Sequence, residues 1–360
     1  MNNSQDLKLA ALRRQIDAVD ASIVASLNQR AQLALAVGKV KHETGAPVYR
    51  PEREAQVLLK LTEGNGGPLP DAALAAIYRE VISACRELER RMRIAYLGPP
   101  GTFSEEALRR HFGDGVEAIS CSSIDEVFRA TESGACDFGV APIENSTEGA
   151  VNRTMDLLQH TGLEISGEVS IPIRHNLLAA TASIAGVSRI CAHPQALAQC
   201  QTWLDRNAAG IERVPVSSNA EGARLASIEP HTAAIAGEGA ARVYALEFVG
   251  RSIQDDPSNR TRFIVLGKYR CAPTGADQTS LILSVPDRAG AVHALIEPLA
   301  RHGVSMKRFE SRPARQGNWE YYFYIDVLGH QADAAVASAL TELRDNAAFY
   351  RVIGSYPRAA

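Results

Sequence analysis

The feature that most constrains the fold is a long helical periodicity near the start of the chain. Between Leu9 and Val40, apolar side chains recur mostly every third or fourth residue, with no proline and with Gly38 as the single glycine. Residues at this spacing share one face of an α-helix, so the stretch predicts one long helix. The sequence Thr44-Gly45-Ala46-Pro47 ends it, because glycine and proline interrupt helices.

Two more helices are expected before the character of the chain changes. The second runs from about Pro51 to Leu61, and the third from about Asp71 to Met92, after the glycine-rich residues 64–68. Residues 1–92 are therefore predicted to form an all-helical first domain.

At Arg93 the pattern changes to alternating strands and helices. The apolar run Ile94–Leu97 reads as a strand, and strand-like and helix-like runs then alternate to about Leu266. This alternation is typical of an α/β domain that binds ligands at its strand ends. We expect the domain to span residues 93–270, and we expect the polar stretch from Lys268 to Asp277 to be a linker.

The last part of the chain, residues 276–360, predicts a ferredoxin-like α+β domain. Its expected elements alternate in the order strand, helix, strand, strand, helix and strand. They are Ser280–Val285, Ala291–His302, Val304–Ser311, Trp319–Val327, Asp333–Asp345 and Tyr350–Tyr356.

Length and composition narrow the possible classes of protein. At 360 residues, two or three domains are expected, and a net charge of -3 gives no general attraction to nucleic acid or membranes. The first residues lack the apolar core of a signal segment, and no later apolar run reaches the length of about 18 residues that a membrane span needs. The six cysteines form no CxxC or Cys/His cluster and are expected to be free thiols. We therefore expect a cytoplasmic protein.

Three basic residues of the long helix are candidates for binding an anionic ligand. Arg30 and Lys41 are eleven residues apart, which places them within about 20° of the same face and roughly 16 Å apart along the axis. Arg13 lies about 26 Å from Arg30 and is rotated by roughly 100°, so it can share their ligand only from another copy of the chain. The alternative is that all three are solvated charges on a coiled-coil dimerisation helix.

A wider motif pattern surrounds these charges. It comprises Leu12-Arg13-x-x-Ile16-Asp17-x-x-Asp20, Gln29-Arg30, Val37-Gly38-Lys39-Val40-Lys41, Pro47-Val48, Arg53-Glu54 and Cys85-x-x-x-Glu89. This pattern closely resembles the all-helical chorismate mutase family and covers residues 1 to about 92.

The resemblance implies a site that binds the two carboxylates of chorismate and holds the substrate for its rearrangement. The implied side chains are Arg13, Arg30, Lys41, Arg53, Glu54, Cys85 and Glu89. Lys41 and Glu89 would flank the ether oxygen on which charge develops. Positioning and electrostatics suffice for a pericyclic step, which needs no nucleophile or metal.

The chain departs from the family pattern at three positions. Arg50 stands where some members have Asp, Cys85 where some have Ser, and Glu89 where others have Gln. A glutamate donates a hydrogen bond only when protonated, so mutase activity is expected to fall as pH rises unless the site keeps the carboxyl neutral.

The α/β domain carries a second set of motifs. They are Gly98-Pro99-x-Gly101-Thr102-Phe103-Ser104, Pro142–Gly149, His175-Asn176-Leu177-Leu178, His193–Cys200 and Thr261-Arg262-Phe263. Taken singly, each is compatible with an ordinary turn, helix cap or structural histidine. In this order they resemble prephenate dehydratase, a family with two α/β lobes like those of solute-binding proteins and a site in the cleft between them.

The resemblance assigns roles in the conversion of prephenate. Thr261 would assist departure of the ring hydroxyl while carbon dioxide leaves, with Asn145 and Gln199 in the polar site and Arg262 and Phe263 shaping it. Thr102 and Ser104 begin a helix whose N-terminal N–H groups would bind substrate anions. Where some relatives have serine before the His-Pro-Gln segment, this chain has Ala192.

Two motifs of the C-terminal domain resemble the phenylalanine-binding ACT domain, whose site lies between subunits. They are Gly290-Ala291-Val292, with valine in place of the more usual leucine, and Glu310-Ser311-Arg312-Pro313. The resemblance implies feedback inhibition by phenylalanine through differential binding to a less active state.

The motifs together predict a bifunctional, homo-oligomeric enzyme that converts chorismate to prephenate and then to phenylpyruvate. The expected oligomer is a dimer or larger, with a mutase site shared between protomers, and no metal or organic cofactor is implied. One alternative is a monofunctional dehydratase whose helices only dimerise. Another is a non-enzymatic amino-acid-sensing or solute-binding protein built from the same lobes.

Overall fold

The computed structural model describes residues 3–285, 289–313 and 321–359. The chain divides into two compact units. The first comprises Met1–Arg50, Val57–Met92 and Phe112–Val116, and the second comprises Pro51–Gln56, Arg93–His111 and Glu117–Ala360.

Three helices occupy the N-terminal part of the chain, as expected. They are α1 (Asn3–Thr44), α2 (Pro51–Glu63) and α3 (Asp71–Glu89), and α1 packs against α3. Most apolar side chains of α1 are nevertheless exposed, among them Leu12 at 56%, Ile16 at 58% and Val19 at 57%. A single chain therefore leaves the apolar face of α1 largely uncovered.

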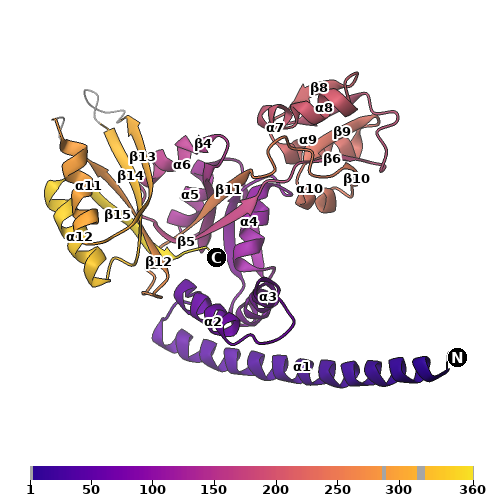
Figure 1. The fold of residues 1–360 in the computed structure, drawn as a ribbon, viewed down its shortest axis with the longest axis horizontal. Coiled ribbons are helices and arrows are strands. Elements are labelled where there is room, and N and C mark those ends of the chain that lie inside the picture. The colour runs from indigo at the N-terminus through magenta and orange to yellow at the C-terminus, as the bar shows by residue number, and fades with distance from the viewer. Residues whose placement is uncertain (1–2, 286–288, 314–320, 360) are drawn as a thin grey trace. The chain divides into compact units, whose positions relative to one another are not determined.

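The α/β part of the chain forms two lobes, each built on its own sheet (Figure 1). In the first lobe the sheet order is β2-β1-β3-β11-β5, with β4 paired to β3. Its strands are β1 (Met92–Leu97), β2 (Val116–Cys121), β3 (Phe138–Asn145), β4 (Gly149–Ala150), β5 (Glu164–Pro172) and β11 (Arg260–Gly267). Its helices are α4 (Phe103–Phe112), α5 (Ile124–Glu132) and α6 (Asn152–Leu158).

The second lobe has the sheet order β10-β6-β9-β7-β8. Its strands are β6 (Asn176–Ala179), β7 (Arg189–Ala192), β8 (Glu212–Pro215), β9 (Thr232–Ala236) and β10 (Glu247–Gly250). Its helices are α7 (Pro194–Gln199), α8 (Gln201–Asn207), α9 (Asn219–Ile228) and α10 (Glu238–Val243). The chain enters this lobe after β5 and returns to the first lobe as β11, which pairs antiparallel with both β3 and β5.

The C-terminal domain has the expected ferredoxin-like arrangement. Its strands are β12 (Asp277–Ser284), β13 (Met306–Pro313), β14 (Tyr321–Leu328) and β15 (Phe349–Pro357), in the antiparallel sheet order β13-β14-β12-β15. Its helices are α11 (Ala291–Arg301) and α12 (Ala334–Asn346). The start of the predicted third strand, residues 319–320, lies outside the described residues.

The two faces of this sheet pack against different partners. Leu281 and Leu283 of β12 join the core beneath α11 and α12. Ile282, which points to the opposite face because side chains alternate along a strand, joins Tyr356 in the core of the first lobe. The C-terminal domain and the first lobe therefore share a continuous hydrophobic core.

The stretch expected to be a linker connects β11 to β12, and most of its residues from 268 to 276 are exposed, but Cys271 is buried in the core that the two domains share. Cys271 is 7% exposed and belongs to the shared core, and its carbonyl oxygen lies 3.0 Å from Nε2 of His330. Asp277 is not linker but the first residue of β12. At its end, Oγ1 of Thr274 donates to Oδ1 of Asp277 at 2.7 Å, a local hydrogen bond of the turn that leads into β12.

No described helix combines the length and apolar character needed to cross a membrane.

Candidate active sites

The helical unit places an ion pair where α1 and α3 end. Nζ of Lys41 lies 3.1 Å from Oε2 of Glu89 and donates a second hydrogen bond to the carbonyl oxygen of Val48 at 3.0 Å. A Cβ at Gly38 would lie 2.8 Å from Cγ of Glu89, so a side chain at this position would displace the carboxylate. Glycine at position 38 thus allows Glu89 to approach Lys41.

The other predicted mutase residues lie on all three helices. Cys85 is buried on α3, Arg30 is half-buried on α1, and Arg53 and Glu54 lie in the first turn of α2. Arg13 is exposed on α1, which is continuous from Asn3 to Thr44, so about 26 Å of helix separates it from Arg30. Within one chain, α1 does not bring Arg13 to the other basic residues.

In the α/β domain, the structure brings Thr261 and Asn145 together. The two residues are cross-strand partners where β11 begins and β3 ends, and Nδ2 of Asn145 lies 2.8 Å from Oγ1 of Thr261. The amide orientation of Asn145 is fixed, because its Oδ1 accepts the backbone N–H groups of Thr147 at 3.0 Å and Glu148 at 3.1 Å. Nδ2 therefore donates to Thr261, whose own hydroxyl hydrogen is left to donate elsewhere.

The same reasoning fixes the direction of a hydrogen-bond chain that joins the two lobes. Nδ2 of Asn145 donates to Oδ1 of Asn259 at 2.8 Å, so Nδ2 of Asn259 donates to Oε1 of Gln199 at 3.0 Å. Nε2 of Gln199 then donates to Oε1 of Glu148 at 3.4 Å. Each amide has one orientation that satisfies its neighbours, so the chain links Gln199 of the second lobe to Asn145 of the first through Asn259.

His175 ends this chain in a defined tautomer. Its Nε2 lies 3.0 Å from Oε1 of Gln199, which can only accept, so Nε2 carries the hydrogen and Nδ1 does not. Burial lowers the pKa of His175 below its ordinary value, although the hydrogen bond with Gln199 acts to raise it. The ring of Phe103 packs edge-on at 5.6 Å, and within the described part of the chain Nδ1 has no hydrogen-bond partner. The site thus contains a neutral imidazole with a buried acceptor.

Asn259, His175 and Glu148 were not among the predicted site residues. Asn259 is 2% exposed and His175 also 2%, although both are polar. A signal for Asn259 was its position two residues before Thr261, on the same side of an extended chain.

The glycine-rich loop before α4 differs from the expected anion site. The N–H of Gly101 already donates to Oε2 of Glu105 at 2.8 Å, and Oγ1 of Thr102 donates to the carbonyl oxygen of Leu97 at 3.1 Å. Ser104 is 6% exposed within α4. The side chain of Glu105 therefore occupies the position expected for an anion, and Thr102 acts in the turn that starts the helix.

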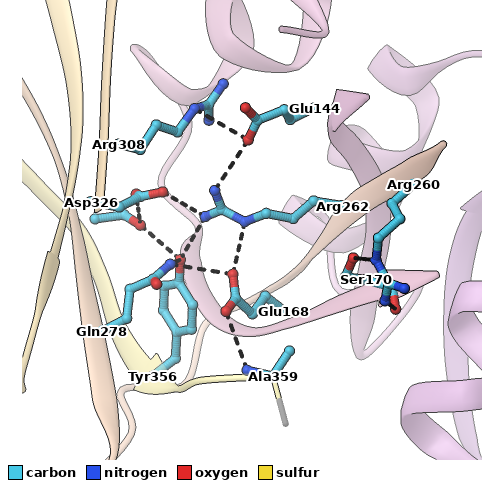
Figure 2. A network of polar contacts seen from close by, with 11 residues as sticks. Glu144, Glu168, Ser170, Arg260, Arg262, Gln278, Arg308, Asp326, Tyr356 and Ala359 are labelled. Atoms are coloured by element: carbon cyan, nitrogen blue, oxygen red, sulfur yellow. Dashed lines mark hydrogen bonds and ion pairs between the residues drawn. The ribbon is translucent and has the colours of Figure 1, made fainter. Parts of the chain in front are cut away.

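Arg262 does not join the polar site, which corrects the prediction that it binds substrate beside Thr261. Successive side chains of a strand point to opposite faces, so Arg262 lies on the other side of β11 from Thr261. Its guanidinium contacts Glu168 of β5 and Asp326 of β14 (Figure 2). Phe263 is 2% exposed and contributes to the fold as a core side chain.

The predicted effector residues are also divided between two environments. Gly290 caps α11 with φ at 76°, followed by Ala291 and the partly exposed Val292. Arg312, in contrast, reaches the first lobe, where Nη1 donates to the carbonyl oxygen of Asn152 at 2.7 Å and Nη2 lies 3.1 Å from Oδ1 of Asp156. The prediction that Arg312 lines an effector pocket with its neighbours is therefore revised, because Arg312 links β13 to α6.

The remaining residues of this motif lie on β13 without a comparable contact to the first lobe. Ser311 and Pro313 are exposed, and Glu310 is half-buried opposite Tyr324 of β14. Across the described residues, no group of three His, Cys, Asp or Glu side chains is arranged to hold a metal ion.

Three family models match the chain in succession. They are chorismate mutase type II over residues 12–90, prephenate dehydratase over residues 94–270 and the ACT domain over residues 279–345. A bifunctional chorismate mutase/prephenate dehydratase of Neisseria gonorrhoeae is 48% identical over 362 residues, which cover 100% of this chain and 99% of the relative.

Two solved structures each resemble about three quarters of the chain. A prephenate dehydratase from Arthrobacter aurescens in complex with L-Phe is 34% identical with a TM-score of 0.68, covering 74% of this chain and 90% of that one. A structure described as GqqA, a novel type of quorum quenching acylases, is 28% identical with a TM-score of 0.68, covering 74% of this chain and 98% of that one.

Proposed function

The chain belongs to the bifunctional chorismate mutase/prephenate dehydratase family, and we propose that its helices rearrange chorismate while its two lobes convert prephenate to phenylpyruvate. The observation that carries the dehydratase assignment is the direction of the hydrogen bond between Asn145 and Thr261, in which Asn145 donates and Thr261 accepts. A threonine oxygen that accepts a hydrogen bond keeps its hydrogen for a ligand.

In the proposed dehydratase step, the bond between the ring and its carboxylate breaks and carbon dioxide leaves. The electron pair of that bond passes through the ring and expels the hydroxyl group from the opposite carbon. Thr261 donates its hydrogen bond to this departing oxygen, which takes one proton from the solvent and leaves as water. Aromatisation drives the step, so a placed donor and groups that orient the carboxylates suffice. Asn145 orients the hydroxyl of Thr261, Gln199 links Asn259 to His175, and Nδ1 of neutral His175 is an acceptor.

In the proposed mutase step, Lys41 stabilises negative charge on the ether oxygen of chorismate as the carbon–oxygen bond breaks. Glu89 is the second group at that oxygen, and its ion pair with Lys41 orients both side chains. The basic side chains of Arg13, Arg30 and Arg53 bind the two carboxylates, and Glu54 and Cys85 complete the site.

Glu89→Gln is expected to remove the alkaline fall of mutase activity. Only a protonated Glu89 donates a hydrogen bond to the ether oxygen, whereas the carboxylate that pairs with Lys41 only accepts. Glutamine donates at every pH. Mutase kcat/KM measured against pH should therefore fall in the parent enzyme and stay level in the variant, while both preparations share one dehydratase profile. Identical mutase profiles would remove this role from Glu89.

The C-terminal domain is proposed to bind phenylalanine and to reduce dehydratase activity. Support comes from the Arthrobacter aurescens prephenate dehydratase, which was solved in complex with L-Phe. The residues proposed for the effector site are those of the Gly290 turn with Ala291 and Val292, together with Glu310, Ser311 and Pro313. Arg312 carries the response to the first lobe through Asp156.

Arg312→Ala is expected to weaken inhibition by phenylalanine without abolishing catalysis. Loss of its contacts with Asn152 and Asp156 uncouples β13 from α6, which should raise the half-inhibitory phenylalanine concentration by about fivefold or more. Phenylpyruvate release from prephenate at increasing phenylalanine measures the effect. Arg344→Ala, which removes an exposed arginine from α12 of the same domain, serves as the matched control. An unchanged inhibition curve for Arg312→Ala would refute this assignment.

We further propose a homodimer or larger oligomer in which two copies of α1 share the mutase sites. The exposed apolar side chains of α1 require a cover, and Arg13 is too far from Arg30 on the same helix to hold the same small ligand. A second copy supplies both the cover and Arg13.

The proposed domain boundaries are residues 1–92 for the mutase, 93–270 for the dehydratase and 276–360 for the regulatory domain. A cytoplasmic location is proposed as well, because all six cysteines are buried free thiols, which suits a reducing compartment.

A further inference from the structure

The two neighbouring cross-strand pairs of β3 and β11 face opposite sides of the first-lobe sheet. Thr261 pairs with Asn145, and Arg262 pairs with Glu144. Thr261 and Asn145 form the catalytic contact, whereas Arg262 and Glu144 point toward the C-terminal domain (Figure 2). Thr261 and Asn145 are thus each adjacent in sequence to a residue that the C-terminal domain contacts.

Arg262 lies within a set of side chains that we call the Arg262 clamp, formed by Arg262, Glu168, Asp326 and Tyr356. Nε of Arg262 donates to Oε2 of Glu168 at 2.8 Å, and Nη2 donates to Oδ2 of Asp326 at 2.6 Å and to the Tyr356 hydroxyl at 3.4 Å. The side chains of Arg262, Glu168 and Asp326 are 18%, 10% and 8% exposed. These are charge-assisted contacts shielded from water, which makes them directional and strong.

The members of the clamp are themselves held by β12. Oγ of Ser280 donates to Oδ1 of Asp326 at 2.5 Å, and Nε2 of Gln278 lies 2.9 Å from the Tyr356 hydroxyl and 3.2 Å from Oε2 of Glu168. Burial raises the pKa of Tyr356, so its hydroxyl stays protonated and neutral. A network in which each group has partners fixes the position of Arg262.

Glu144 makes a second connection of the same kind. Its Oε2 lies 3.5 Å from Nη1 of Arg262 and 3.4 Å from Nε of Arg308, which belongs to β13 of the C-terminal domain. Both strands that carry catalytic residues are therefore attached to the C-terminal sheet by the residue next to the catalytic one.

The backbones around the clamp are in close contact. A Cβ at Gly354 of β15 would overlap the carbonyl oxygen of Ile165 in β5, so the two strands touch through glycine. β5 also carries Glu168 and pairs with β11 along its length. A shift of the C-terminal sheet therefore moves β5 and β11 together, because a packed interface transmits displacement.

We propose that Arg262 is a positioning residue of the dehydratase site, held by the C-terminal domain so that it fixes the start of β11 and with it the Thr261 hydroxyl. The C-terminal domain is then a structural part of the catalytic site as well as its regulator. Any change in its position reaches Thr261 through Arg262. The inference rests on the proposed dehydratase activity.

The test compares steady-state dehydratase kinetics of the full-length protein and its variants Arg262→Gln, Arg262→Lys and Asp326→Asn. Arg262→Gln should lower kcat about tenfold or more and change KM less than about threefold, since Thr261 is misplaced while the substrate-binding groups remain. Arg262→Lys should recover part of kcat. Asp326→Asn, on another domain, should lower kcat about threefold, and adding it to Arg262→Gln should cost little more, because both changes break one contact.

Arg260→Gln is the matched control. Arg260 points to the same face of β11 but is exposed, and it bonds to Ser170 of β5 rather than to the C-terminal domain (Figure 2). Its kcat should equal that of the parent enzyme. Thermal unfolding and mutase activity are measured for every variant to report the amount of folded protein. A lower dehydratase kcat with unchanged folding then indicates a misplaced Thr261.

The possible outcomes are distinguishable. If the parent enzyme forms no phenylpyruvate from prephenate, the proposed function fails. If the parent is active and Arg262→Gln keeps its kcat, the positioning role is overturned. It is also overturned if the losses of Arg262→Gln and Asp326→Asn multiply independently, or if kcat falls only in proportion to the folded fraction.

Discussion

Thr261→Ala is expected to lose nearly all dehydratase turnover while keeping mutase activity. Removing a preorganised donor from developing negative charge costs about 10²–10³ in kcat. The hydroxyl of Thr261 is such a donor, because its oxygen accepts a hydrogen bond from Nδ2 of Asn145 at 2.8 Å and its own hydrogen is left to donate to the substrate. Separate assays with prephenate and chorismate on the same preparation measure the two activities.

Two further substitutions at position 261 separate the hydroxyl from the shape of the side chain. Thr261→Ser keeps the hydroxyl and should retain a substantial part of kcat. Thr261→Val keeps the shape without the hydroxyl and should be as inactive as Thr261→Ala. If Thr261→Val were as active as the parent enzyme, the hydroxyl would have no part in the reaction.

Mutase activity is expected to return when two inactive variants of the helical unit are combined. Arg13→Ala and Arg30→Ala should each lower mutase activity about 10²-fold or more, since each removes a cation that binds a substrate carboxylate. In a dimer with shared sites, a mixed oligomer has one site with both arginines and one site with neither. Equal co-expression and random pairing should therefore restore about a quarter of the sites.

The control for this mixing experiment is the double variant Arg13→Ala/Arg30→Ala, co-expressed with Arg30→Ala. None of the resulting sites contains both arginines, so no activity should return. Dehydratase activity measured in every mixture reports the amount of folded enzyme. Absence of recovery from Arg13→Ala with Arg30→Ala would place both arginines in a site of one chain, against the distance along α1.

Much of the fold could be predicted because the elements have strong local periodicity. The helix expected from Leu9 to Val40 is α1, which extends a few residues further at each end, and the third helix begins at Asp71 as expected. The element order of the C-terminal domain was predicted correctly, because the apolar residues of its strands and of its helices recur with different periods. The burial of Cys271 within the expected linker was not predicted, since it depends on contacts with distant residues that local composition does not contain.

Site residues that belong to sequence motifs could be predicted. The direction in which a side chain points, and therefore which residues it contacts, was predicted less well. Thr261 and Asn145 meet as cross-strand partners, and Lys41 meets Glu89. Arg262 was misplaced although strand alternation already predicts that it faces away from Thr261. The direction of Arg312 could not be inferred, because it depends on how the C-terminal sheet packs on α6.

The central claim, that one chain performs two successive reactions under phenylalanine control, is tested most directly by a time course with chorismate as the only substrate. Purified enzyme should consume chorismate, form prephenate and then release phenylpyruvate, and added phenylalanine should slow phenylpyruvate release. Consumption of chorismate that stops at prephenate without effector, or no consumption of chorismate at all, would contradict the account.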